Sequence, residues 1–343
     1  MQAIGLSGPA LALLAGGIGG STLAPMKRIK NWPWENWWLV FAACTYFLSP
    51  WIVAAFSIPH LLSVYRLAGR NATLETFFIG MAWGFAVVLA GKALDLVGYS
   101  LNTALVYGSS VALGSLGALF LIDRSKLFST TGLWILAWDI VLLVGVGLCA
   151  QAGRLREPAL EEFRTVNSGQ SVPNRTGLGI LFSLLAGVLA TLFNIALANG
   201  EPIRHQAIAL GADPNLAANA IWSLAVSAGS LPSIVWCAYL VTRRSNWSLH
   251  WKPHSGANFL LCGAMGGLWI TGTVLYGVSS ARLGRLGPAI GWPIYMTSLI
   301  ITGNLWGWAW GEWRGASPLS VKLFWSGVAV LILGIVSLSL AAN

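Results

Sequence analysis

Residues 131–151 read TGLWILAWDIVLLVGVGLCAQ, an apolar run whose single charged side chain is Asp139. A helix of about 20 such residues crosses the roughly 30 Å hydrocarbon core of a bilayer. The same pattern occurs in nine further stretches: 3–24, 36–57, 75–94, 97–121, 177–198, 217–241, 257–279, 286–308 and 319–340. Since lipid leaves the backbone of an open sheet unsatisfied, we predict an all-α polytopic membrane protein with ten transmembrane helices.

The composition excludes a soluble enzyme, a disordered chain and a fibrous repeat. Of 343 residues, 56% are hydrophobic and 9% are charged, whereas soluble domains contain about 25% charged residues. The net charge is +9, but the Lys and Arg residues lie in short clusters between apolar runs, as expected beside the anionic cytoplasmic leaflet. The charge therefore indicates membrane lipid, and not nucleic acid, as a partner.

The basic residues also predict an orientation. Of the 20 Lys and Arg residues, thirteen follow the odd-numbered spans and seven follow the even-numbered spans. Because basic connections are retained in the cytoplasm, we predict that the odd connections are cytoplasmic and that both termini are periplasmic.

The chain divides around its longest polar connection. We assign 1–152 to a first five-helix repeat, 153–176 to the polar connection and 177–343 to a second five-helix repeat. Four positions recur 186 residues later: Gly80, Trp83, Gly91 and Gly98 match Gly266, Trp269, Gly277 and Gly284. Because each half has an odd number of spans, the second repeat enters the membrane inverted. Inverted repeats are typical of secondary transporters, with the solute site between the halves.

Signals for catalysis are weak. The chain contains no HExxH, GxSxG or GK[ST] motif. Its four cysteines lie inside apolar runs, and Pro253 between His250 and His254 argues against a helical metal pair. We therefore predict a transporter without a metal or a cofactor. A different class, an intramembrane enzyme or sensory scaffold, has only Asp139 and the histidines in its support.

Five motifs resemble the L-rhamnose–proton symporter family. They are APMKRIKNWPWE at 24–35, GMAWG at 80–84, AGRLRE at 152–157, ALGADP at 209–214 and GEWRGA at 311–316. They occur in the family's order along nearly the whole chain. The resemblance implies the drug/metabolite transporter fold, with two inverted five-helix repeats in the bacterial inner membrane. It also implies uptake of L-rhamnose or a related deoxy-sugar by proton symport and alternating access, driven by the proton gradient.

The start of the ninth span departs from that family. Residues 287–295 read GPAIGWPIY and contain no acidic residue, whereas proton-coupled members carry an acid there. The departure leaves open an alternative, a transporter or facilitator of the same fold for another small polar or aromatic solute without proton coupling. Pro288 and Pro293 in this stretch are expected to kink the helix and free backbone carbonyls at the site.

Neutral polar and aromatic side chains suit a sugar, because amides and hydroxyls match its hydroxyl groups and rings pack on its C–H face. The candidates lie in the fourth, sixth, eighth and ninth spans: Asn102, Tyr107, Asn194, Asn199, Tyr276, Trp292, Tyr295 and Asn304. Each has a competing interpretation as a hydrogen bond between helices. Trp83 and Trp269, at equivalent repeat positions, predict a paired wall of the cavity.

Two ionisable side chains are candidates for proton coupling. Lys92 lies near the end of the third span, three residues before Asp95, and Asp139 lies in the middle of the fifth. Ionisable groups at membrane depth are rare and usually functional. The competing interpretations are a helix-end ion pair for Lys92 and a carboxyl group bonded to a hydroxyl or amide for Asp139. We favour Lys92, because the fifth span of this fold class packs at the periphery.

Overall fold

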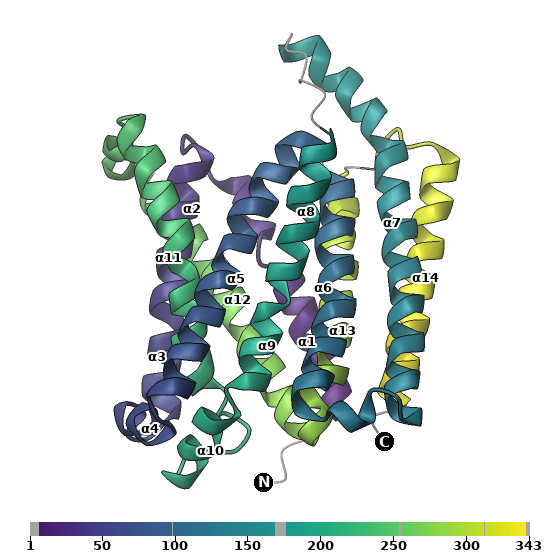
Figure 1. The fold of residues 1–343 in the computed structure, drawn as a ribbon. Helices are drawn as coiled ribbons and strands as arrows, with labels where there is room; N and C mark the ends of the chain where they lie inside the picture. Colours follow the sequence, from purple (N-terminus) through teal and green to yellow (C-terminus); the bar gives the residue numbers. More distant parts are fainter. Residues whose placement is uncertain (1–6, 98, 169–175, 254, 312, 341–343) are drawn as a thin grey trace, which may run out of the picture.

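The computed structural model describes residues 7–97, 99–168, 176–253, 255–311 and 313–340. Long helices stand side by side in one bundle, with short helices at its ends (Figure 1). The α-helices are α1 (Gly8–Gly20), α2 (Trp34–Ala42), α3 (Ser49–Ser57), α4 (Leu61–Ala68), α5 (Arg70–Val97), α6 (Tyr99–Ile122), α7 (Thr130–Ser168), α8 (Thr176–Ala190), α9 (Leu192–Asn199), α10 (Glu201–Ala209), α11 (Asn219–Arg243), α12 (Ser255–Arg282), α13 (Gly287–Ala309) and α14 (Pro318–Leu340). The described residues form no strand.

Nine helical stretches in this part of the chain are long and apolar enough to cross a membrane. They coincide with nine of the ten predicted spans, so the all-helical membrane fold is confirmed to that extent. The remaining predicted span, 286–308, forms the helix α13 but is not among the nine. Its Gly, Pro, Trp, Tyr and Asn residues lower its mean hydropathy, although much of the helix is buried inside the protein.

Two predicted spans are interrupted helices. The span 36–57 consists of α2, the π-helical turn η2 (Ala43–Leu48) and α3. Pro50 has no N–H to donate to the carbonyl of Tyr46, so the regular ladder cannot continue through this point. The span 177–198 is divided at Thr191 into α8 and α9. The first part of the predicted polar connection is helical, because α7 continues to Ser168 and rises beyond the bundle (Figure 1).

The two halves of the chain interleave. In the first half, α1 packs against α12 and α13 of the second. In the second half, α8 packs against α5 and α6 of the first. At one edge of the bundle α7 lies along α14, and toward the other edge α11 lies against α2, α3 and α5 (Figure 1).

Glycines allow the backbones of α5 and α11 to touch. A Cβ atom added at Gly80 would lie 2.0 Å from the carbonyl oxygen of Ala225, and one at Gly84 would lie 2.0 Å from that of Gly229. Such contacts matter in membranes, where helix association relies on close van der Waals packing rather than on a hydrophobic driving force.

The α5–α11 contact predicts opposite effects for two glycine substitutions in one helix. Gly84→Ala should lower the free energy of unfolding by about 1–3 kcal/mol, because the methyl group overpacks the interface. Gly91→Ala is the matched control: beyond its chain neighbours and its own helix backbone, no atom of the described residues lies within 4 Å of the added Cβ, so stability should stay the same or rise by about 0.5–1 kcal/mol. Denaturant or thermal unfolding in detergent measures both. Equal stability of the two variants would contradict the close approach.

Candidate functional site

Aromatic rings from six elements meet in the core of the bundle. We call this group the central aromatic cluster. Its members are Tyr46 of η2, Trp83 of α5, Phe193 of α9, Trp222 of α11, Trp269 and Tyr276 of α12, and Trp292 and Tyr295 of α13. Trp222, Tyr276 and Trp292 are at most 2% exposed. Both halves of the chain supply rings, as expected for a site between them.

The two tryptophans that the repeat pattern paired are in contact. The ring centroids of Trp83 and Trp269 lie 6.4 Å apart with an interplanar angle of 30°. Tyr46 lies edge-on to both rings, at centroid distances of 5.6 and 4.8 Å. Stacked and edge-to-face arrangements are the favoured geometries of aromatic pairs. The π-helical turn that contains Tyr46 thus places its ring between α5 and α12.

Asn194 is a buried hydrogen-bond centre beside the rings. Its side-chain nitrogen donates to the carbonyl oxygen of Gly114 at 3.0 Å and to that of Pro288 at 2.9 Å. Its side-chain oxygen accepts a hydrogen bond from the hydroxyl of Tyr276. One side chain of α9 therefore bonds to α6, α12 and α13. Burial of so polar a group is tolerated because both its amide hydrogens and its oxygen have partners.

The aromatic residues of α13 are fixed from two sides. The indole nitrogen of Trp292 donates to the carbonyl oxygen of Ser110 on α6 at 2.8 Å. Gly114 makes room for this ring, since a Cβ there would lie 2.3 Å from the indole nitrogen. Tyr295 stacks on Tyr276 with ring centroids 4.8 Å apart. Four predicted solute-binding residues, Asn194, Tyr276, Trp292 and Tyr295, are thereby brought together.

The other predicted solute-binding residues lie around this group or away from it. Tyr107 packs against the same buried core from α6. Asn102 donates to the carbonyl oxygen of Ala90 at 3.0 Å and accepts from Ser183 at 2.9 Å, so it joins α5, α6 and α8. Asn304 bonds to a carbonyl of its own helix, that of Ile300.

Asn199 lies at one end of the bundle, in an open pocket of about 440 Å³. Its amide donates to a carboxylate oxygen of Glu75 at 3.3 Å. The pocket is lined by Asn71, Leu74, Glu75, Phe78, Ile79 and Asn199. It combines apolar walls with a carboxylate and two amides.

The two candidate coupling residues occupy contrasting environments. The Lys92 side chain is exposed, and its ammonium lies 4.7 Å from the ring centroid of Trp236 on α11, a cation–π contact. Its predicted neighbour Asp95 has a side chain outside the described part of the structure. Asp139 is 1% exposed, and neither of its carboxyl oxygens has a hydrogen-bond partner within the described residues. Lys92 is therefore a cation at the protein surface, whereas Asp139 is an acid in the protein interior.

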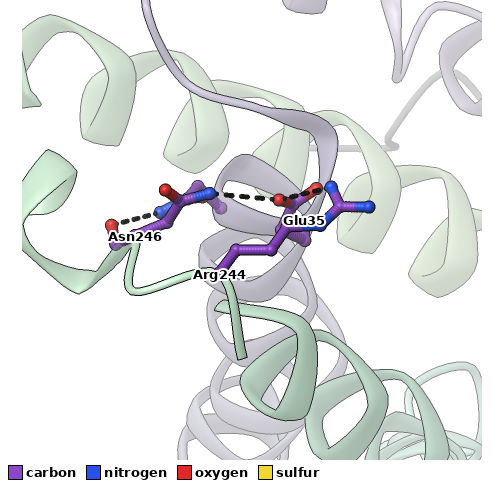
Figure 2. A network of polar contacts seen from close by, with 4 residues as sticks. Glu35, Arg244 and Asn246 are labelled. Atoms are coloured by element: carbon purple, nitrogen blue, oxygen red, sulfur yellow. Dashed lines mark hydrogen bonds and ion pairs between the residues drawn. The ribbon is translucent and has the colours of Figure 1, made fainter. Parts of the chain in front are cut away.

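A polar network joins the start of α2 to the residues just after α11 (Figure 2), at the opposite end of the bundle from the end of α9, where Asn199 lies (Figure 1). A carboxylate oxygen of Glu35 accepts hydrogen bonds from Arg244 at 2.8 Å and from Asn246 at 3.3 Å. The amide of Asn36 donates to the carbonyl oxygen of Asn246 at 3.0 Å. The Glu35 side chain is 3% exposed, whereas that of Arg244 is 58% exposed. Glu35 also lies in the first turn of α2, where the helix dipole favours a negative charge.

Several residues of these sites were absent from the sequence predictions. Glu75 could have been found as an acid on the first residue of a predicted span. Tyr46 had a weaker signal in Pro50, which interrupts the helix four residues later. Phe193 and Trp222 had none, because aromatic residues are common in all the spans of a chain with 19 tryptophans.

Comparison with known proteins gives one consistent result. The family model described as L-rhamnose-proton symport protein (RhaT) matches residues 6–343. The chain is 26% identical over 333 residues to the L-rhamnose-proton symporter of Cronobacter sakazakii, and the match covers 93% of each protein. It is 25% identical over 332 residues to the L-rhamnose-proton symporter of Klebsiella pneumoniae (strain 342), again covering 93% of each.

The bonds of Asn194 predict a cost in stability when its amide is removed. Asn194→Leu should lower the free energy of unfolding by about 1–3 kcal/mol, because two buried carbonyl oxygens and a tyrosine hydroxyl lose their partner. Asn304→Leu is the matched control, since that amide bonds within its own helix and should change stability less. Thermal unfolding in detergent compares the two, and equal losses would contradict the bridging role of Asn194.

The Glu35 network predicts that a buried ion pair contributes more to stability than an exposed one. Glu35→Gln should lower the free energy of unfolding by about 1–3 kcal/mol. The variant replaces the buried carboxylate by a neutral amide, so the charge-assisted hydrogen bond from Arg244 is lost. Glu201→Gln disrupts the exposed Glu201–Arg204 pair, whose side chains are 55% and 29% exposed, and should cost at most about 0.5 kcal/mol. Unfolding measured at low and high salt tests the pair, and a Glu201 effect as large as the Glu35 effect would refute the prediction.

Proposed function

This chain belongs to the L-rhamnose-proton symport protein family, and on that premise we propose that it takes up L-rhamnose or a related deoxy-sugar together with protons. The family is one of transporters, so the chain is a multi-pass membrane transporter and not an enzyme. The observation that carries the proposal is the match of the family model to residues 6–343.

The proposed solute site is the central aromatic cluster. A sugar presents neutral hydroxyl groups and an apolar C–H face, and buried sites commonly combine aromatic walls with a few polar groups. The cluster offers the faces of Trp83 and Trp269 beside Asn194, Tyr276 and Tyr295. Its members are uncharged, which suits a neutral solute.

Ten spans in two inverted repeats are the proposed architecture, and the packing supports it. The first span of the first half, α1, packs against α12 and α13, the third and fourth spans of the second half. In the same way α8, in the first span of the second half, packs against α5 and α6, the third and fourth spans of the first half. The recurring glycines follow the same relation. Gly80 approaches α11, and Gly266 approaches Thr45 of η2, so each glycine meets the second span of the opposite half.

Alternating access is proposed to occur between the two ends of this bundle. With both termini periplasmic, the Glu75 pocket opens toward the periplasm and the Glu35 network closes the cytoplasmic ends of α2 and α11. A solute would enter through the pocket, reach the aromatic cluster and leave after the network opens. The proton gradient across the inner membrane supplies the driving force.

A second candidate function has one specific observation in its favour. The start of α13 lacks the acid of proton-coupled members, and the central aromatic cluster contains no carboxylate. A facilitator of the same fold, acting on another small polar or aromatic solute, would need neither.

Reconstitution in proteoliposomes tests the proposed function. We expect counterflow of labelled L-rhamnose, with competition by related deoxy-sugars and little by D-glucose. An inward-directed proton gradient should drive accumulation above the equilibrium level, and a protonophore should abolish that accumulation while leaving counterflow intact. Counterflow without gradient-driven accumulation would favour the facilitator. Absence of counterflow with every deoxy-sugar would refute the proposed solute class.

A further inference from the structure

Among the described residues of the helices that pack around it, the buried acid Asp139 has no charged neighbour. Helix α7 packs against α6, α13 and α14 and, at its start, against η3 (Arg124–Lys126). The ionisable side chains of α6, α13 and α14 are Tyr99, Tyr107, Tyr295 and Lys322.

The cations near α7 lie toward its two ends. Lys322 is at the far end from Asp139, because Ser320 donates to the carbonyl oxygen of Ala152, more than three turns along α7. Arg124 and Lys126 precede the first turn of α7, more than two turns before Asp139. On α7 itself, Cys149 and the charged residues from Arg154 onward follow Asp139 by several turns. An ionised Asp139 would therefore lack a counter-charge, which is costly in a buried site.

Across the contact between α6 and α7, the hydroxyl of Ser115 lies beside the Asp139 carboxyl group, and no hydrogen bond joins the two in the structure. A serine has one hydrogen to donate, and in the structure Ser115 gives it to the carbonyl oxygen of Ala289 on α13, at 2.7 Å. That carbonyl is available because the residue four positions later is Pro293, which has no N–H. Pro293 thus leaves the carbonyl oxygen of Ala289 without a partner in its own helix, as predicted for a proline in this span.

The Ser115–Ala289 bond adjoins the solute site. Pro288, the preceding residue, accepts a hydrogen bond from Asn194 through its carbonyl oxygen. Two side chains, Ser115 from α6 and Asn194 from α9, therefore hold consecutive carbonyls in the first turn of α13. The same helix carries Trp292 and Tyr295 into the central aromatic cluster. A change at Ala289 reaches the proposed solute site within one turn.

We propose that Asp139 is the proton-binding residue of this transporter and that Ser115 transmits its charge state to α13. When Asp139 is protonated, Ser115 bonds to Ala289 and fastens α13 to α6. When Asp139 releases its proton to water, the carboxylate takes the hydrogen bond of Ser115, because a charge-assisted bond is about twice as strong as a neutral one. The hydrogen stays covalently on Ser115, whose hydroxyl rotates, and Ala289 loses its donor. The inference rests on the proposed proton symport and names its residues.

Lys92 remains a separate prediction from the sequence. Its exposed side chain contacts Trp236 of α11, whereas Asp139 lies beside Ser115, which bonds α6 to α13. The structure thus places next to the acid a hydroxyl that is itself bonded to the helix of the proposed solute site.

The first test does not depend on the solute. Infrared difference spectra of the reconstituted full chain between acidic and alkaline buffer should contain the C=O band of a protonated carboxyl group that Asp139→Asn removes. Asp213→Asn, in an exposed turn, should leave that band in place. Ser115→Ala should shift the carboxylate band of Asp139, and Ser115→Thr should restore it. A band unaffected by Asp139→Asn overturns the proton site, and a band unaffected by Ser115→Ala overturns the switch.

The second test measures coupling. Asp139→Asn and Ser115→Ala should retain L-rhamnose counterflow and lose accumulation driven by a proton gradient, while Ser115→Thr and Asp213→Asn should retain both. Wild-type accumulation in Asp139→Asn overturns the inference. A wild-type chain that transports no deoxy-sugar refutes the proposed function instead, and the infrared titration then still decides whether Asp139 binds a proton that Ser115 senses.

Discussion

The interior of a bilayer offers no hydrogen-bond partner to a backbone carbonyl or amide, and this constraint governs the structure. It favours helices throughout the described chain. Where a helix is interrupted, another group must form the hydrogen bond that the backbone has lost. At Pro293 the interruption frees the carbonyl of Ala289, and Ser115 from another helix supplies the missing donor. A proline in one helix thereby creates a specific bond to a second.

Close packing determines how the helices are arranged around that contact. Apolar side chains gain little from leaving lipid for protein, so helices associate where small residues allow their backbones to touch. Gly84 and Gly229 do so between α5 and α11, and Gly16 does so between α1 and the carbonyl of Tyr295. Because α1 and α8 each pack on the opposite half, helices of both halves meet in the core, and both halves supply rings to the central aromatic cluster.

Charge is distributed so that the core stays neutral. Glu35 with Arg244, at the start of α2, and Glu75 with Asn199, at the end of α9, lie at opposite ends of the bundle, and the side chains of Arg244 and Glu75 are exposed. The central aromatic cluster contains neutral hydrogen-bonding groups, which a sugar can match without loss of a charge's hydration. Among the described residues, Asp139 is the exception in this pattern, because it is a buried acid without the paired cation that Glu35 has, and the Ser115 hydroxyl lies between it and the helix that carries Trp292 and Tyr295.

The sequence alone determined the membrane class, the approximate position of each long helix, the family, four candidate solute-binding residues that meet in the core, and the pairing of Trp83 with Trp269. The membrane class and the helix positions follow from hydropathy and spacing, which are local properties of the chain. Asn194, Tyr276, Trp292 and Tyr295 could be selected because they differ in polarity or size from the apolar residues around them. Tertiary structure alone decided that Asn102 bridges three helices, that Lys92 faces outward and that Ser115 lies between Asp139 and Ala289. Those relations depend on which face of a helix meets which neighbour, and helix faces are set by contacts between residues far apart in the sequence.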